Sequence, residues 1–367
     1  MGLVSVTTYP VAVPQPAGSG RSGMIKSLVV ELKTDDGLSG FGEALSPASP
    51  AAAAAIIDDC FAPFLIGADE TAIGGLWEKM RAALVPRAAG SGAEAVSAVD
   101  IALWDLLGQR LKAPIHVLLG GHRRARLYAY GSFIGWIDDQ QAAAQAQRAV
   151  AIGFRQIKVK LQPPLTASIA RARLMRDVVG GNIGLVADPN AGFDDIEAIQ
   201  LAHVLAGLGY LWLEEPIDPK NYTGLAAIKR LGLLPIAAGE SEFGPLGAFN
   251  LVSAGAVNLL QPDVGRVGGI TGFVGSVNAA AANGIPFAPH HAGGAIKAAA
   301  SLHLAAALPG FRVMECSLLR TALHDELTEN PVAHPSQLDG DGTIPVPQGP
   351  GLGITIDRGA LERLTVR

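Results

Sequence analysis

The sequence predicts an α/β fold in which a closed barrel of parallel strands follows a smaller α+β domain. Two patterns predict it: strand patterns with a hairpin turn before residue 50, and apolar runs that alternate with helix-length segments over residues 126–316. The chain is also rich in core-forming residues, since 49% of its 367 residues are hydrophobic. A chain of this length fits roughly two domains.

The first region, residues 1–120, has the patterns of an α+β capping domain. The segment 27–34 reads as a strand, and the turn Asp36-Gly37 after it predicts an antiparallel hairpin. A helix is predicted at 95–111, where apolar residues recur at three- and four-residue spacing. The Gly120-Gly121 break follows, and we place the domain boundary there.

Eight strand candidates follow this boundary: RLYAYGSF, QIKVK, IGLVAD, YLWLEE, LPIAAGE, AVNLLQPD, IPFAPH and FRVME. Helical patterns such as 167–179 and 194–208 separate them. Strands that alternate with helices run parallel with the helices outside, and eight such units close into a barrel. An open doubly wound sheet is the alternative, but no Gly-rich phosphate turn follows the first run. We expect a barrel over 121–339, with the extended tail at about 340–367 packed on the capping domain.

A polar residue ends seven of these runs, at intervals of 23 to 28 positions. The seven are Lys160, Asp188, Glu214, Glu240, Asp263, His290 and Glu315. The carboxyl ends of all strands converge on one face of a βα barrel, where active sites lie. Residues far apart in the sequence are therefore predicted to meet in one pocket.

Three of these residues are acids that end consecutive runs, namely Asp188, Glu214 and Glu240. Three carboxylates in one place would repel one another unless a cation lies between them. Carboxylate oxygens are the ligands that Mg²⁺ prefers. The spacing therefore predicts a site for Mg²⁺ or a similar ion.

The remaining strand-end residues are candidates for proton transfer. Lys158 and Lys160 share one face of a strand, although such a pair more often lies on an exposed face. Asp263 can hydrogen-bond an imidazole and raise its basicity. Spacing alone does not decide whether that imidazole belongs to His290 or to His291.

In its ordered motifs the chain resembles the enolase superfamily, and within it the mandelate racemase/muconate lactonizing enzyme subgroup. The resemblance spans nearly the whole chain and rests on DGLSGFGEA (36–44), SAVDIALWDLLG (97–108), LLGG, KVK (158–160), DPN (188–190), EEP (214–216), GE (239–240), QPD (261–263), PH (289–290) and ME (314–315). Two positions depart from related patterns. Ser241 stands where racemases of the subgroup often have Asn, and Asp263 stands where muconate cycloisomerases carry Lys.

The resemblance implies a (β/α)7β modified TIM barrel with one Mg²⁺ per subunit, bound by Asp188, Glu214 and Glu240. It implies that Lys160 is the base on one substrate face with Lys158 beside it, and that His290, paired with Asp263, serves the opposite face. It favours His290 over His291, because His290 follows its strand directly. Glu315 would hydrogen-bond the substrate carboxylate, donating the bond if it is protonated, and Asn190 would contact the metal or its outer shell.

The implied chemistry is abstraction of the proton next to a carboxylate, which gives an ene-diolate. Bases on both faces permit three outcomes: racemisation or epimerisation of a 2-hydroxy acid, dehydration of an acid sugar to a 2-keto-3-deoxy acid, and ring opening of an acid-sugar lactone by a cycloisomerase. The loop PQPAGSGRSG is small and polar, and its Arg21 can meet a distal carboxylate or hydroxyl. We therefore favour an aldonate or aldarate dehydratase. A non-enzymatic binding barrel is disfavoured, because no metal ligand or base is missing.

Composition narrows the partners. A formal net charge of −5 argues against a nucleic-acid partner. The start of the chain lacks the pattern of a signal peptide, and no run of about 18 apolar residues indicates a membrane span. Cys60 and Cys316 are too few for a disulfide scaffold. We expect a soluble cytoplasmic protein that acts on a small-molecule carboxylate, and the resemblance implies a homo-oligomer, from dimer to octamer.

Overall fold

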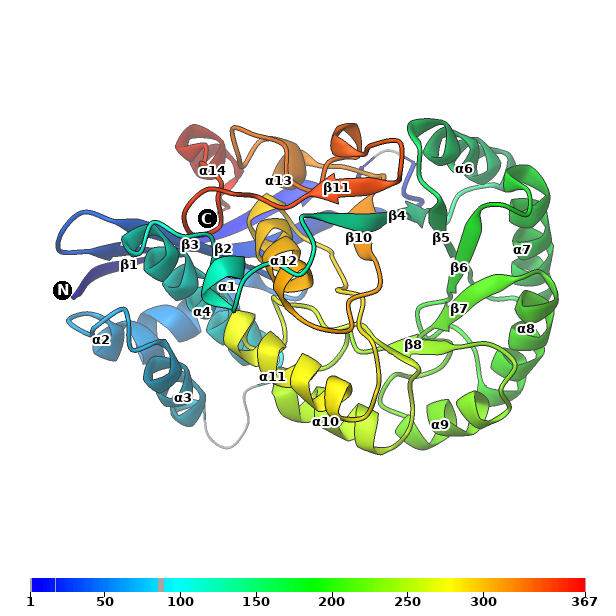
Figure 1. Cartoon of the computed structure of the whole chain (residues 1–367), viewed down its shortest axis with the longest axis horizontal. Coiled ribbons are helices and arrows are strands. Elements are labelled where there is room, and N and C mark those ends of the chain that lie inside the picture. The colour runs from blue at the N-terminus through cyan, green and yellow to red at the C-terminus, as the bar shows by residue number, and fades with distance from the viewer. Residues whose placement is uncertain (1, 17, 85–88, 367) are drawn as a thin grey trace.

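The structure is a computed structural model that describes residues 2–16, 18–84 and 89–366. Its elements form two parts that lie side by side, an antiparallel sheet with its helices and a ring of parallel strands surrounded by helices (Figure 1). The predicted α/β fold, a barrel with an α+β capping domain, is confirmed.

The first part contains a three-stranded antiparallel sheet in the order β1-β2-β3. Its strands are β1 (Leu3–Pro14), β2 (Met24–Thr34) and β3 (Ser39–Leu45), and its helices are α1 (Pro50–Ile56), α2 (Ala62–Leu65), α3 (Ile73–Ala83) and α4 (Ser91–Arg110), with a π-helical turn at Ile57–Phe61. Helix α4 lies directly on β3. A Cβ at Gly42 would stand 1.9 Å from the carbonyl oxygen of Ala98, so the close approach requires glycine there.

The second part is a parallel barrel whose hydrogen-bonded order is β10-β4-β5-β6-β7-β8-β9. The strands are β4 (Arg126–Ile134), β5 (Gln156–Lys160), β6 (Gly184–Asp188), β7 (Tyr210–Glu214), β8 (Ile236–Ala238), β9 (Leu259–Leu260) and β10 (Met314–Ser317). The helices between them are α6 (Asp139–Ile152), α7 (Leu165–Val179), α8 (Asp195–Gly207), α9 (Tyr222–Arg230), α10 (Gly244–Ser253), α11 (Gly269–Ala282) and α12 (Ala295–Ala307). Figure 1 shows these helices around the outside of the strands. A cluster of buried side chains that includes Tyr130, Val186 and Trp212 packs apart from the main barrel core.

The seventh predicted strand, IPFAPH, is reduced to a single bridging residue. Phe287 bridges Leu260 on one side and Phe311 on the other, which closes the ring between β9 and the segment before β10. Pro286 and Pro289 bracket this residue and have no N–H to donate to a ladder. The run therefore has too few backbone N–H donors to form a regular strand, although the bridges of Phe287 still close the barrel.

The carboxyl-terminal tail contacts both parts. We expected all of it on the capping domain, but β11 (Thr343–Pro345) pairs antiparallel with the first residues of β4. Strand β10 covers β4 only from Ala129 onward, which leaves the earlier backbone groups for β11. Further along, Thr365 bridges Val11 of β1, beyond α14 (Arg358–Leu364). Short elements complete the chain: α5 (Ile115–Leu118), α13 (Ala322–Asp325) and a 3₁₀ turn at Pro335–Gln337.

Two further features concern the chain as a whole. Within the described residues, every helix is too short or too polar to cross a membrane.

Both cysteines are free thiols, with Cys60 exposed and Cys316 buried. Burial raises the pKa of the Cys316 thiol to about 12, so this group remains protonated and is not a nucleophile.

Candidate active site

Four of the seven strand-end residues, Lys160, Glu240, His290 and Glu315, line one cavity of about 270 Å³ between the barrel and the loop that joins β1 to β2. Its lining includes Lys158, Lys160, Glu240, His290 and Glu315 from the barrel. The capping domain contributes Arg21 and residues that precede and follow it in the sequence. Residues that are 155 positions apart, Lys160 and Glu315, thus share one pocket.

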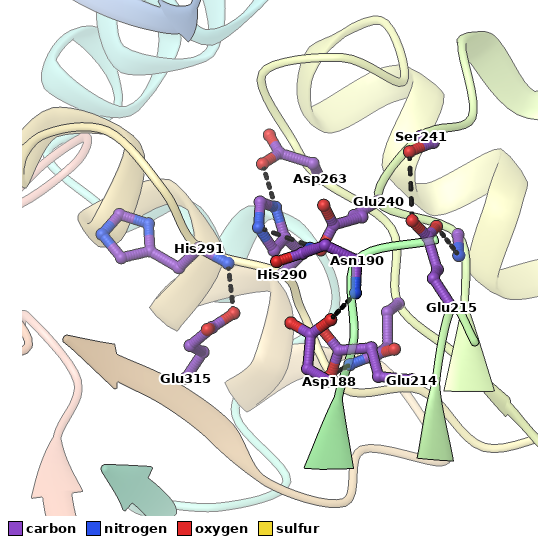
Figure 2. A network of polar contacts seen from close by, with 12 residues as sticks. Asp188, Asn190, Glu214, Glu215, Glu240, Ser241, Asp263, His290, His291 and Glu315 are labelled. Atoms are coloured by element: carbon purple, nitrogen blue, oxygen red, sulfur yellow. Dashed lines mark hydrogen bonds and ion pairs between the residues drawn. The ribbon is translucent and has the colours of Figure 1, made fainter. Parts of the chain in front are cut away.

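Three carboxylates meet at the ends of neighbouring strands. Asp188 ends β6, Glu214 ends β7 and Glu240 follows β8, and one oxygen of each lies within 4.8 Å of the others. Figure 2 shows the three side chains grouped together. Asp188 and Glu214 are fully buried, whereas Glu240 is partly exposed. Three hard oxygen donors at this separation suit a divalent cation.

The charges of this triad depend on its neighbours. Burial, together with repulsion from Asp188 and Glu240, raises the pKa of Glu214 to about 7 although Lys158 lowers it. Burial also acts on Asp188, but Lys160 and Lys158 outweigh it and hold the pKa of that carboxyl below its usual range. The protein alone therefore compensates Asp188 better than Glu214, and a cation between them would compensate both.

Both lysines of β5 lie on the inner face of the barrel. The Nζ of Lys158 is 2.8 Å from Glu214 Oε1 and 2.8 Å from Glu315 Oε1. The Nζ of Lys160 contacts Asp188 and donates to Asn190 Oδ1 at 2.8 Å. Asn190 also donates its backbone N–H to Asp188 Oδ1, 2.9 Å away, so it joins a candidate base to a candidate ligand.

Glu315 is an acceptor in this structure. Its Oε2 accepts the backbone N–H of His291 at 2.9 Å, and its Oε1 faces Lys158. Burial would raise the pKa of Glu315, but Lys158 and His290 outweigh it and lower that pKa to about 2. Glu315 is thus an acceptor in this arrangement, and its hydrogen bond to the substrate carboxylate stays a prediction.

The structure distinguishes the two adjacent histidines. His290 Nδ1 lies 2.6 Å from Asp263 Oδ2, and His290 Nε2 lies 3.3 Å from Glu240 Oε2 (Figure 2). Since Asp263 can only accept, Nδ1 carries the proton and Nε2 faces the triad. The ring of His291 points away from the triad, and among the described residues neither of its nitrogens has a hydrogen-bond partner. Burial lowers the pKa of His291 well below its usual value, so that ring is neutral.

Arg21 lies on the capping side of the cavity, against an aromatic residue that the sequence analysis did not single out. Its guanidinium carbon is 3.8 Å from the ring centre of Trp136, and the Nζ of Lys160 is 5.7 Å from the same ring. The loop is held to the barrel because Trp136 donates its backbone N–H to Ser19 and Gln145 donates to Gly18. Trp136 follows the end of β4 by two residues, and its position after a strand was the available signal.

Two more residues were missed, Lys297 on α12 and Glu43 on β3. Both are fully buried, and Lys297 contacts Asp263. Neither ends a strand, so strand-end spacing does not reveal them. A signal was present, however, because Lys297 is the only Asp, Glu, Lys or Arg between residues 267 and 311.

Comparison with known proteins shows similarity over the whole chain. Residues 4–120 match the family model described as mandelate racemase/muconate lactonizing enzyme, N-terminal domain, and residues 141–360 match the model described as enolase C-terminal domain-like. The chain is 33% identical to D-galactarolactone cycloisomerase of Agrobacterium fabrum, over 95% of this chain and 93% of that protein. It is also 33% identical to arabinonate dehydratase of Saccharolobus solfataricus, over 91% of this chain and 89% of that protein.

Solved structures agree with this similarity. The 3,6-anhydro-D-galactonate cycloisomerase from Zobellia galactanivorans superposes with a TM-score of 0.91 at 29% identity and covers 100% of both chains. A racemase from Streptomyces coelicolor A3(2) with bound magnesium superposes with a TM-score of 0.90 at 30% identity, over 99% of this chain and 100% of that one. The relatives thus include dehydratases and isomerases.

Proposed function

Because this chain belongs to the mandelate racemase/muconate lactonizing enzyme family of the enolase superfamily, and is therefore an enzyme, we propose that it dehydrates an acid sugar. In this reaction an aldonate or aldarate loses its α-proton and its β-hydroxyl and becomes a 2-keto-3-deoxy acid. One observation carries the proposal. Two candidate proton-transfer groups, Lys160 and His290, line a single cavity and adjoin different carboxylates of one acidic triad.

The triad fits Mg²⁺, one ion per subunit. Asp188, Glu214 and Glu240 would hold it through oxygens that already lie within 4.8 Å of one another. When bound, the ion would stabilise the negative charge that develops on the substrate carboxylate as the α-proton leaves. The buried and otherwise poorly compensated Glu214 supports this assignment.

The protein side chains divide the proton transfers between them. Lys160 takes the α-proton, and the electron pair of that C–H bond forms the new C=C bond. His290 gives a proton from Nε2 to the β-hydroxyl, which leaves as water, and the enol product then tautomerises to the keto acid. Lys158, held between Glu214 and Glu315, adds positive charge beside the substrate carboxylate.

Substrate recognition is proposed for the capping side. Arg21 can bond a distal hydroxyl or carboxylate, and its stacking on Trp136 fixes the direction in which the guanidinium points. Asn190 would orient the substrate near Lys160. A polar acid sugar suits these side chains better than an aromatic 2-hydroxy acid does.

A second candidate is ring opening of an acid-sugar lactone, which the similarity to D-galactarolactone cycloisomerase favours. The same two residues would serve. The leaving group would be the ring oxygen of the lactone, which stays in the product as part of a carboxylate, and no water would be released.

The test is a panel of aldonates, aldarates, their lactones and other 2-hydroxy acids, incubated with Mg²⁺ in D₂O and followed by proton NMR and a 2-keto-acid assay. A 2-keto-3-deoxy acid from an open-chain acid supports dehydration, whereas a keto acid from lactones alone supports ring opening. Deuterium at the α-carbon without any keto acid would overturn both and indicate racemisation or epimerisation. Parallel samples with EDTA test the need for the metal.

A further inference from the structure

Lys297 is a charged residue in the first turn of a buried, mainly apolar helix. Every residue of α12 from Ala295 to Ala307 is buried, and Lys297 itself has 0% exposure. A buried ammonium is costly unless it is paired. Its partner is Asp263, whose Oδ2 lies 2.7 Å from the Lys297 Nζ.

This pairing completes the fixation of Asp263. Oδ2 faces both Lys297 Nζ and His290 Nδ1, at 2.7 and 2.6 Å, and Oδ1 accepts the backbone N–H of Gly265 at 2.8 Å. The three donors come from α12, from the segment after Phe287 and from the loop after β9. A carboxylate held from three directions cannot turn, so the ring of His290 that bonds to it is held as well.

The helix that carries Lys297 is in turn attached to the capping domain. Glu43 of β3 accepts the backbone N–H of Gly294 at 2.5 Å and that of Lys297 at 3.1 Å, at the first turn of α12. Ser27 of β2 donates to the same carboxylate at 2.8 Å. A carboxylate at a helix N-terminus is favourable, and here it ties α12 to the antiparallel sheet.

Stability is a weak explanation for this arrangement, because replacing a buried ion pair by apolar residues is often neutral or stabilising. We propose that Lys297 is a positioning residue that fixes Asp263, and through it the imidazole of His290, so that Nε2 is presented to the substrate. Glu43 extends this support to the capping domain. The catalytic consequence of the inference rests on the proposed function, whereas the geometric part does not.

The geometric part is tested without substrate. A proton shared between an imidazole Nδ1 and a buried carboxylate gives a low-field proton NMR signal, and the signal of His290 is identified by its loss in His290→Asn. We expect Lys297→Met to abolish or broaden this signal, because Asp263 gains freedom to turn. The matched control is Lys229→Met, which removes an ammonium that donates to the carbonyl of Val257 at 2.7 Å, and it should leave the signal unchanged.

An unchanged low-field signal in Lys297→Met would overturn the proposal. Lys297→Gln is the second variant, since it keeps a shorter donor and disturbs the surrounding packing less. Lys297→Gln should broaden or weaken the same signal less than Lys297→Met does. If the Met variant does not fold, the signal of the Gln variant decides whether Lys297 positions His290. Far-ultraviolet circular dichroism of each variant identifies those that fold.

The catalytic part is tested by a double-mutant cycle. In the otherwise unchanged enzyme, Lys297→Met should lower kcat about 10- to 100-fold, as loss of an outer-shell partner does, with KM little changed. In a His290→Asn background the same substitution should have no further effect, because Lys297 acts only through His290. Deuterium exchange that depends on Lys160 should persist in both.

The two proposals fail separately. Equal losses from Lys297→Met in both backgrounds would show a general structural role and overturn the positioning role. If the unsubstituted enzyme acts on no member of the panel, the proposed function fails. The low-field signal then still decides whether Lys297 positions His290.

Discussion

Lys158 contacts both Asp188 and Glu214 of the acidic triad, whereas Glu240 contacts His290 and is the residue whose removal is easiest to interpret. It is partly exposed, so Glu240→Gln removes a charged ligand with little effect on burial. We expect the affinity for Mg²⁺ to fall by at least roughly 10- to 100-fold. Loss of an outer-shell partner alone typically has an effect of that size, and Glu240 is proposed to be a direct ligand. Isothermal titration calorimetry measures this, with the exposed Glu362→Gln as the control. Equal affinity in the two variants would contradict the role of Glu240 as a ligand.

The two candidate bases should have separable effects. Lys160→Ala and His290→Asn should each slow turnover by about 10²- to 10⁴-fold, the usual contribution of a general acid or base. Each should also abolish α-proton exchange on its own substrate face, which stereochemically defined substrates in D₂O reveal. His291→Asn is the matched control, because that ring points away from the triad and should matter far less. Full turnover in both Lys160→Ala and His290→Asn would show that the bases are wrongly assigned.

What the sequence reveals about single residues depends on where they lie in an element. Residues at strand ends share a periodic spacing, so their meeting in one cavity follows from the geometry of a parallel barrel. Lys297 and Glu43 lie within a helix and a strand, where a charge usually marks an exposed face. Their burial depends on how α12 packs on β3, which the local pattern does not contain.

Among the elements, predicted helices agree better with the structure than predicted strands do. The patterns at 95–111, 167–179 and 194–208 correspond to α4, α7 and α8 within a few residues. The apolar character of IPFAPH predicts a strand, but two of its residues are prolines and have no backbone N–H to donate. Pairing of β11 with β4 is also invisible locally, since it depends on how far β10 extends.

Helix α4 makes a pH-sensitive contact with α11. Asp100 is fully buried and accepts the N–H and hydroxyl of Thr271 at 2.9 and 2.6 Å. Burial raises its pKa from 3.8 to about 7. A carboxyl with a raised pKa in the folded state contributes stability that is complete below pH of about 3.8 and is lost as the pH rises through about 7.

We therefore expect Asp100→Asn, which is neutral at every pH, to remove this dependence. As the pH rises from 5 to 8, the unfolding free energy of Asp100→Asn should increase relative to that of the unsubstituted protein, by up to about 1.4 kcal/mol per pH unit. Urea titrations at several pH values measure it. The exposed Asp177→Asn is the control. Parallel pH curves for Asp100→Asn and the unsubstituted protein would contradict the expectation.

For the whole molecule, the sequence predicts a barrel under a capping domain because both parts have strong local patterns. How the parts are joined is less visible, since it depends on single long-range contacts. Trp77 of α3 donates to the carbonyl of Gly268 at 2.8 Å, and Leu352 donates its N–H to Asp105 of α4 at 2.8 Å. Such contacts have no periodicity, although they join the capping domain to the barrel and to the tail.

The tail supplies a contact of this kind that can be tested. Arg358, at the start of α14, bonds both oxygens of Glu31 on β2, at 2.6 and 3.2 Å, and the hydroxyl of Tyr9 donates to the same carboxylate. Burial would raise the pKa of Glu31, but hydrogen bonds from Arg358 and other neighbours outweigh it and lower that pKa. Glu31 is 1% exposed, so loss of the guanidinium leaves a buried carboxylate with only the more distant ammonium of Lys33, whose Nζ lies 3.6 Å from Oε1.

Arg358→Ala should therefore destabilise the fold by about 1 to 3 kcal/mol, the range typical of hydrogen bonds to a charged group. Arg363→Ala is the matched control on the same helix, because Arg363 pairs at 2.7 Å with Glu326 and both side chains are exposed. An exposed pair of this kind contributes about 0 to 1 kcal/mol. Thermal unfolding midpoints of the two variants measure the difference. If both fall equally, the tail stabilises the capping sheet through packing and not through the buried carboxylate of Glu31.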